Sequence, residues 1–146
     1  MNKRPRMLLS MICALVCSMA CARDDGEFIT EIGVIEHHVA SEVEALDSPA
    51  SVRQGEPLDL KVRTFGDGCV SPDRIEAEGE DPLFLTPYDR RETDSGCLTS
   101  LYEYFHSVRL TFDVPGTQRL IVRGRRIGEG QQEEFIEQAF TIVVED

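Results

Sequence analysis

The sequence predicts an all-β protein, an antiparallel β-sandwich of about seven strands. The first observation is alternation: Leu58, Leu60 and Val62 are apolar, and the residues between them are charged. A period of two places one face of a strand in a core and the other in water, whereas a helix would scatter these side chains around its circumference. The second observation is the regular spacing of turn signals, and the third is that no segment has a convincing helical period. Short strands joined by turns indicate two packed layers of sheet.

The domain is expected to begin at Phe28, where a short polar segment gives way to apolar residues. We expect a first strand over residues 28–36 with a bulge at Gly33, because the apolar side chains change face there. Residues 40–51 are short for a stable helix and contain Pro49, so a strand or an irregular crossing is expected.

The middle of the chain is predicted to consist of short strands and one long loop. After the glycine-rich bend 64–69, strands are expected at residues 75–78 and 83–86. Residues 88–96 have almost no apolar content and are expected to form a surface loop. Residues 98–105 contain several apolar side chains without a clear period, so this segment predicts either a strand or a single helical turn.

The strongest hairpin signal lies in the last third of the sequence. Apolar and polar residues alternate over 108–113, a turn follows at 114–117, and residues 120–123 form the return strand. A final strand is expected over residues 140–144.

Two of these runs resemble strands of a known class of domain. Residues 55–62 and 112–122 are similar to the early and penultimate hairpin strands of immunoglobulin-like domains in bacterial exported proteins. The resemblance implies an immunoglobulin-like β-sandwich over residues 28–146. The sequence contains no Trp, and its cysteines do not sit at the mid-strand positions that bridge the sheets of antibody domains, so any disulfide is expected to be peripheral.

Residues 1–20 have the layout of a secretory signal peptide. Lys3, Arg4 and Arg6 precede an apolar run over residues 7–20, and this segment has no acidic residue. The run is shorter than the ~20 apolar residues of a membrane-spanning helix. Removing the segment leaves all 27 acidic residues and 15 − 3 = 12 basic ones, so the net charge changes from −12 to 12 − 27 = −15. An acidic surface of this kind repels nucleic acid, which we exclude as a partner.

The cysteines indicate a lipid anchor. Export would leave Cys21, Cys69 and Cys97, an odd number for an oxidising compartment. The tetrapeptide Ser18-Met19-Ala20-Cys21 resembles the lipobox of bacterial lipoproteins, in which the cysteine is acylated and becomes the new amino terminus. The resemblance implies a lipid on Cys21, a membrane contact through that lipid, and a lipidated tether over residues 21–27.

Two further implications of this resemblance stay conditional. Ser18 stands where the family usually has Leu, so ordinary signal peptidase cleavage after Ala20 or Ala22 remains the alternative. Ala22, in place of the Asp that holds such proteins at the inner membrane, implies an outer-membrane lipoprotein facing the periplasm or the surface if the organism is Gram-negative.

Acylation of Cys21 would leave one even pair of cysteines. Cys69 and Cys97 are therefore expected to form a disulfide that closes the loop between them. The chain-entropy model assigns such a bridge roughly 3 to 4 kcal/mol of stabilisation.

The sequence shows no pattern that indicates catalysis. His37 and His38 are adjacent and would face opposite ways on a strand, and His106 has no spacing that suits zinc, so all three are expected at exposed or edge positions. There is no nucleophile elbow, no Ser-His-Asp pattern and no phosphate-binding loop. We predict a protein that is not an enzyme and that has no metal or cofactor.

A basic run stands out against the acidic background. Arg123, Arg125 and Arg126 are expected to form cross-strand ion pairs with glutamates of the last strand, or alternatively to bind an acidic peptide or a glycan. The candidate partner contacts are Tyr88, Arg90, Arg91, Arg123, Arg125 and Arg126.

Two functions follow as hypotheses. The first is an exported, lipid-anchored envelope protein that acts as a non-catalytic binding or structural module. The alternative is an accessory or inhibitory protein that acts on a secreted enzyme through the disulfide-held loop.

Overall fold

The computed structural model describes residues 27–93 and 96–146. The signal peptide, the lipobox with Cys21, and the tether as far as residue 26 lie outside the described residues, and their assignments stay predictions.

The described residues form strands and one short 3-10 turn. The elements are β1 (Phe28–Ile32), β2 (Val34–His37), η1 (His38–Ala40), β3 (Leu46–Asp47), β4 (Ser51–Arg53), β5 (Pro57–Gly66), β6 (Val70–Glu78), β7 (Leu83–Glu92), β8 (Tyr102–Thr111), β9 (Gly116–Ile127) and β10 (Glu133–Glu145). The all-β class is thus confirmed. In this part of the chain no helix has the length and apolar character needed to cross a membrane.

The strands form a mixed sheet that curls around the core. The β5–β8, β6–β7 and β9–β10 pairs are antiparallel, as expected, but β2–β9, β7–β9 and β4–β10 are parallel. The parallel β7–β9 pair arises because β8 leaves this part of the sheet to pair with β5, so the next strand returns in the direction of β7. Residues 27–93 and 96–146 therefore form ten strands with mixed pairing, where about seven antiparallel strands were expected.

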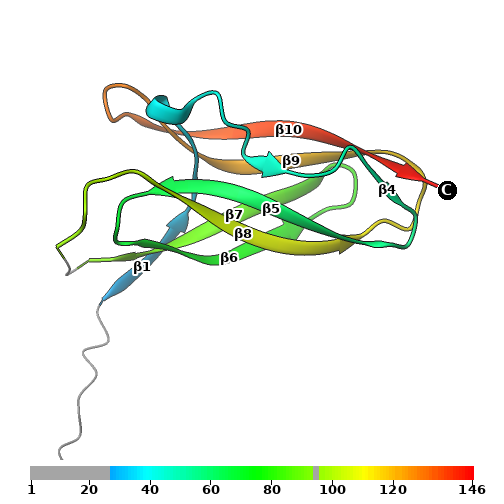
Figure 1. Cartoon of the computed structure of the whole chain (residues 1–146), viewed down its shortest axis with the longest axis horizontal. Helices are drawn as coiled ribbons and strands as arrows, with labels where there is room; N and C mark the ends of the chain where they lie inside the picture. The colour runs from blue at the N-terminus through cyan, green and yellow to red at the C-terminus, as the bar shows by residue number, and fades with distance from the viewer. Residues whose placement is uncertain (1–26, 94–95) are drawn as a thin grey trace, which may run out of the picture.

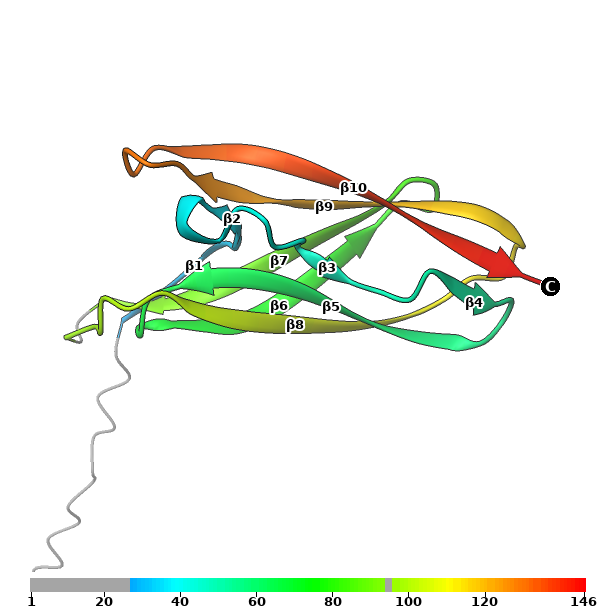
Figure 2. The same cartoon turned by 45° about the horizontal axis from the view of Figure 1, so that its top comes forward.

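The core lies between β5 and the β7–β9–β10 part of the sheet. Figure 1 and Figure 2 show β5 and β8 on one side of the molecule and β9 and β10 on the other. The alternating residues of β5 face inward and are buried against apolar residues of the opposite strands. The buried core includes Leu58, Leu60, Val62, Leu83, Leu85, Leu120, Val122, Ile142 and Val144.

Three local predictions were wrong. The expected hairpin of residues 108–113 and 120–123 does not form, because β8 pairs with β5 while β9 pairs with β7, β2 and β10. The expected surface loop 88–96 begins with strand instead, because β7 extends to Glu92 and pairs with β1 on one edge and β6 on the other. Low apolar content misled here, because Asp89 is an inward-facing position of β7 and is fully buried, as is Pro87 just before the stretch. His106, expected at an exposed or edge position, is 3% exposed on the inward face of β8.

Candidate functional site

The candidate site is a cleft on the outer face of the sheet, where β7 and β9 separate. These strands pair only between residues 83–85 and 120–122. Beyond that point β7 pairs with β1, and β9 pairs with β2. Gly33, which joins β1 to β2, bridges the gap between β7 and β9 and forms the floor of the cleft. Its N–H donates to the Pro87 carbonyl at 2.9 Å, and its carbonyl accepts from the Arg125 N–H at 2.9 Å.

Glycine is needed at two points of this floor because the strands approach closely. A Cβ on Gly33 would lie 2.5 Å from Thr64 Cγ2, and one on Gly124 would lie 2.5 Å from Ile35 Cγ2. Both contacts are shorter than packed side chains tolerate. The interruption expected at Gly33 is present, and it is the point where the chain passes from pairing with β7 to pairing with β9.

The cleft has a volume of about 460 Å³ and a mixed lining. Its lining residues are Ile32, Glu76, Glu78, Thr86, Tyr88, Arg123, Gly124, Phe135, Ile136 and Glu137. Phe135 is 75% exposed, which is unusual for a large aromatic side chain and marks the rim of the cleft as an apolar surface.

The cationic side chains at the cleft already have partners. Arg123 lies 3.6 Å from the centre of the Phe84 ring and donates to Glu137 at 2.9 Å. Arg74 lies 4.1 Å from the centre of the Tyr88 ring and donates to Glu76 at 2.9 Å. These contacts fix the position of both aromatic rings.

A buried polar cluster lies on the inner side of the same floor. Thr64 Oγ1 donates to Asp89 Oδ1 at 3.1 Å and lies 3.3 Å from His106 Nε2, and that nitrogen lies 2.8 Å from Asp89 Oδ1. All three residues are at most 3% exposed. In a Ser-His-Asp triad the hydroxyl and the carboxylate bind different nitrogens of the ring, whereas here both meet Nε2. The cluster therefore satisfies buried polar groups but has neither the geometry nor the access of a nucleophile.

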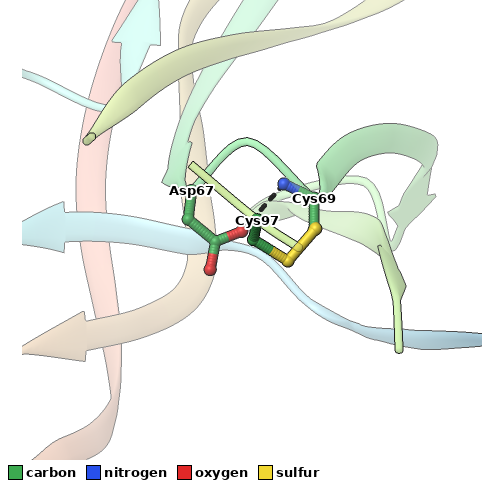
Figure 3. A group of neighbouring side chains, drawn as sticks. All are labelled: Asp67, Cys69 and Cys97. Carbon is green, nitrogen blue, oxygen red and sulfur yellow. Dashed lines mark hydrogen bonds between the residues drawn. A yellow bond between two sulfur atoms is a disulfide. The ribbon is translucent and has the colours of Figure 1, made fainter. Parts of the chain in front are cut away.

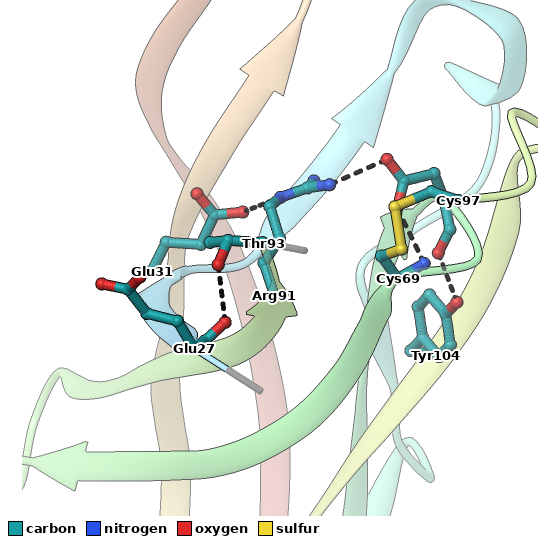
Figure 4. Close-up of a disulfide and its surroundings, with 8 residues drawn as sticks. Glu27, Glu31, Cys69, Arg91, Thr93, Cys97 and Tyr104 are labelled. Carbon is teal, nitrogen blue, oxygen red and sulfur yellow. Dashed lines mark hydrogen bonds and ion pairs between the residues drawn. A yellow bond between two sulfur atoms is a disulfide. The ribbon is translucent and has the colours of Figure 1, made fainter. Parts of the chain in front are cut away.

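A second polar group surrounds the disulfide (Figure 3, Figure 4). The Cys69–Cys97 bridge is formed, with 5.2 Å between the Cα atoms. Asp67 accepts from the Cys69 N–H at 3.0 Å and from Arg91 at 2.8 Å, and its backbone carbonyl accepts from the Tyr104 hydroxyl at 2.7 Å. These bonds connect the bend after β5 to β7 and β8.

Burial disfavours the charged forms of Asp67 and Arg91, whereas their hydrogen bonds favour the charged forms. Burial raises the pKa of Asp67, but the hydrogen bonds from Arg91 and from the Cys69 N–H outweigh it and lower the pKa below 3.8. Burial likewise lowers the pKa of Arg91, while the bonds to Asp67 and Glu31 raise it further, so the net change is upward. The pair is held in its charged form.

The disulfide rules out metal binding by the one group of potential ligands found in the described residues. The Asp67 carboxylate and the two sulfur atoms lie within 4.8 Å of one another. A cysteine binds a metal as a thiolate, and sulfur atoms joined to each other are not thiolates.

The structure brings some of the sequence-predicted contacts together and separates others. Tyr88 and Arg123 both line the cleft. Arg91 and Arg125 meet at Glu31, at 3.2 and 3.0 Å, on the other side of β1. Arg90 pairs with Asp73, and Arg126 with Glu36 and Glu134, so neither reaches the cleft lining.

The predicted cross-strand ion pairs are confirmed: Arg123 with Glu137, Arg125 with Glu133 and Arg126 with Glu134. Sequence reasoning missed Phe135 at the rim and the buried cluster of Thr64, Asp89 and His106. A signal for the cluster was present, because Thr64 continues the inward alternation of β5 and His106 is in phase with Val108 and Leu110.

Comparison with protein-family models, with curated proteins and with solved structures gave no match to this chain.

Proposed function

We propose that the chain is an exported protein, anchored to a membrane by a lipid on Cys21, that binds another macromolecule through the cleft without catalysing a reaction. The observation that carries the binding role is the cleft itself, which combines the exposed Phe135 with aromatic and carboxylate groups on a rigid sheet. Binding sites commonly combine an apolar, concave surface with a few polar groups that orient the ligand. The leader, the lipobox-like sequence and the odd cysteine number support export and anchoring.

The polar groups of the cleft that have no partner favour a ligand that does not need to bind an arginine side chain. Arg123 is committed to Glu137 and Phe84, so an acidic ligand would have to displace an existing pair. No ion pair or hydrogen bond is found for the Glu78 side chain among the described residues. Glu78 lines the cleft and lies opposite Phe84 in the β6–β7 pair. The groups available to a ligand are therefore a carboxylate and two aromatic rings.

A non-catalytic role is supported by the buried cluster described above. Thr64, Asp89 and His106 lie beneath the cleft floor and are closed to solvent. The cleft lining itself has no histidine, serine or cysteine.

We also propose that the fold is a variant of the immunoglobulin-like β-sandwich. Two facing layers and the long β9–β10 hairpin support this assignment, and the parallel β7–β9 pair is a departure that the variant must include. An experimentally determined structure with two facing layers and the parallel β7–β9 pair would support the proposal, and one whose strands do not form two facing layers would contradict it.

The anchoring and binding parts have separate tests. Mass spectrometry of the mature amino terminus should show a diacylglyceryl group on Cys21, and an unmodified terminus after Ala20 or Ala22 would refute the anchor. For binding, envelope extract is passed over the intact protein and over a Tyr88→Ser/Phe135→Ser variant. Phe105→Ser is the matched control, because Phe105 is an exposed aromatic residue of β8 that does not line the cleft.

The intact protein and the Phe105→Ser control should recover the same partner, and the cleft variant should lose it. Equal recovery by all three proteins would refute the cleft as the binding surface. Recovery of a secreted enzyme whose activity falls on binding would favour the accessory or inhibitory alternative over a structural role.

A further inference from the structure

The chain enters the domain beside the disulfide. The Glu27 carbonyl accepts hydrogen bonds from the backbone N–H of Thr93 at 3.0 Å and from its hydroxyl at 2.8 Å (Figure 4). Phe28 pairs with Glu92, whose N–H donates to the Cys69 carbonyl at 3.0 Å. The start of β1, the end of β7 and the disulfide therefore form one end of the molecule, which we call the tether end.

Exposed apolar side chains gather at the tether end. Phe28 and Ile29 begin β1 and are 47% and 45% exposed. Leu98, Leu101 and Tyr102 follow the disulfide and are 66%, 39% and 38% exposed. These five side chains make up half of the ten large apolar residues that are exposed in the described part of the chain.

The most exposed of these residues is held in place. The Gly68 N–H donates to the Leu98 carbonyl at 3.0 Å, and a Cβ on Gly68 would lie only 3.1 Å from Leu98 Cβ. The neighbouring Cys97 is fixed by the disulfide. The backbone at Leu98 is therefore held in place while its side chain stays exposed to solvent. Covering this apolar side chain with another apolar surface would be favourable.

The length of chain before Glu27 limits what can cover this end. If Cys21 carries a lipid, five residues, 22–26, separate the acylated residue from Glu27. At no more than ~3.6 Å per residue, they place the tether end within about 20 Å of the lipid attachment point. A bilayer surface therefore lies within reach of these apolar side chains at all times.

We propose that the tether end is a membrane-contact face, in which Phe28, Ile29, Leu98, Leu101 and Tyr102 rest in the headgroup region of the bilayer and hold the domain in one orientation. This inference rests on the proposed lipidation of Cys21. It adds a protein contact to the diacylglyceryl anchor, and that contact would restrict the orientation of the domain at the bilayer.

The charges at this end favour an uncharged membrane surface. Arg63, Arg90 and Arg91 are each paired with a carboxylate, at 3.5, 3.1 and 2.8 Å respectively, so they are not free to attract anionic lipids. With a net charge near 12 − 27 = −15 after removal of the leader, the protein is repelled by anionic headgroups. The face therefore fits a zwitterionic bilayer, and the apolar side chains supply the contact.

Fluorescence tests the proposal directly because the sequence contains no tryptophan. Leu98→Trp introduces one reporter at the tether end, and Val114→Trp introduces another at a residue that is 74% exposed in the β8–β9 turn, at the opposite end of the molecule. Each lipidated protein is reconstituted into phosphatidylcholine vesicles with and without acyl-chain bromination. Bromine quenches tryptophan only when the two are in contact.

Leu98→Trp should show a blue-shifted emission that brominated vesicles quench, and Val114→Trp should show neither effect. An anchored protein whose Leu98→Trp emission is unquenched would overturn the proposal. So would a blue shift without quenching, which would mean that protein covers this end, or equal quenching at both positions.

The failure of the anchor and the failure of the face are distinguishable. Absence of lipid from Cys21 by mass spectrometry would refute the proposed anchoring. The face is then tested on a chain that begins at Cys21 and is coupled through the Cys21 thiol to a maleimide lipid, where quenching at position 98 alone supports membrane contact and its absence overturns it.

Discussion

Removal of the disulfide should cost this domain a large part of its stability. Replacing both cysteines by alanine opens a loop with a sequence separation of 28 residues. The chain-entropy model assigns the closure of such a loop about 12 cal/mol/K, or about 3.6 kcal/mol at 25 °C. Natural domains have a total stability of about 5 to 15 kcal/mol. Alanine is the better replacement because Cys69 is only 8% exposed, and serine would bury a hydroxyl group there.

Urea unfolding followed by circular dichroism measures this loss. With a slope of about 1 to 3 kcal/mol per molar, a loss of about 3.6 kcal/mol should lower the midpoint by about 1 to 4 M. The unmodified protein in a reducing agent is the control and should show the same decrease. A loss below about 1 kcal/mol would refute the reasoning, because it would mean that the hydrogen bonds from Tyr104 to the Asp67 carbonyl and from Gly68 to the Leu98 carbonyl already hold the loop in the reduced chain.

Three further substitutions test the floor of the cleft and the polar groups near it. Gly33→Ala should destabilise by about 1 to 3 kcal/mol, because its Cβ would lie 2.5 Å from Thr64 Cγ2, whereas Gly96→Ala, with no atom within 4 Å, should leave the urea midpoint unchanged. Asp89→Ala should cost about 1 to 3 kcal/mol, because it leaves the buried hydroxyl and imidazole groups without their acceptor, and a midpoint within error of the unmodified protein would contradict this. The lowered pKa of Asp67 means that its contribution to stability is present above the unfolded pKa near 3.8 and is lost as pH falls through the lower folded pKa. Asp67→Asn should therefore flatten the fall in urea midpoint on acidification below about pH 4, and an unchanged acid profile would show that other carboxylates control it.

The sequence allowed prediction of those elements whose pattern is local. The alternation of β5 predicted its buried face. The turn between β8 and β9 was located correctly, but the two strands that it joins do not pair with each other as the local pattern predicted. The ion pairs of Arg123, Arg125 and Arg126 were predictable because neighbouring antiparallel strands near a turn set their own register. The cysteine count predicted the Cys69–Cys97 bridge because few pairings remained.

What could not be predicted depends on which distant strands meet. β7 was misjudged at its carboxyl end because Asp89 is polar, and its burial follows only from contact with His106 and Thr64, 17 and 25 residues away. The cleft likewise depends on the separation of β7 and β9, which no local pattern of either strand records. The exposure of Phe135 is of the same kind, since its apolar character alone predicts a core position.

The cleft and the buried polar cluster lie on opposite sides of the same backbone segment at Gly33. Gly33 is the point at which the chain crosses from β7 to β9, and its absent side chain leaves room for Thr64 and Asp89 directly beneath. A side chain at residue 33 would either move the backbone between β1 and β2 outward into the cleft or displace the Asp89 carboxylate. Because the backbone at Gly33 packs directly on Thr64 and Asp89, we expect the shape of the cleft to depend on these two side chains staying in place. Substitutions such as Asp89→Ala should therefore weaken binding at the cleft as well as stability, although Asp89 does not line it. A variant that loses stability and keeps full partner recovery would show that the floor is rigid without the cluster.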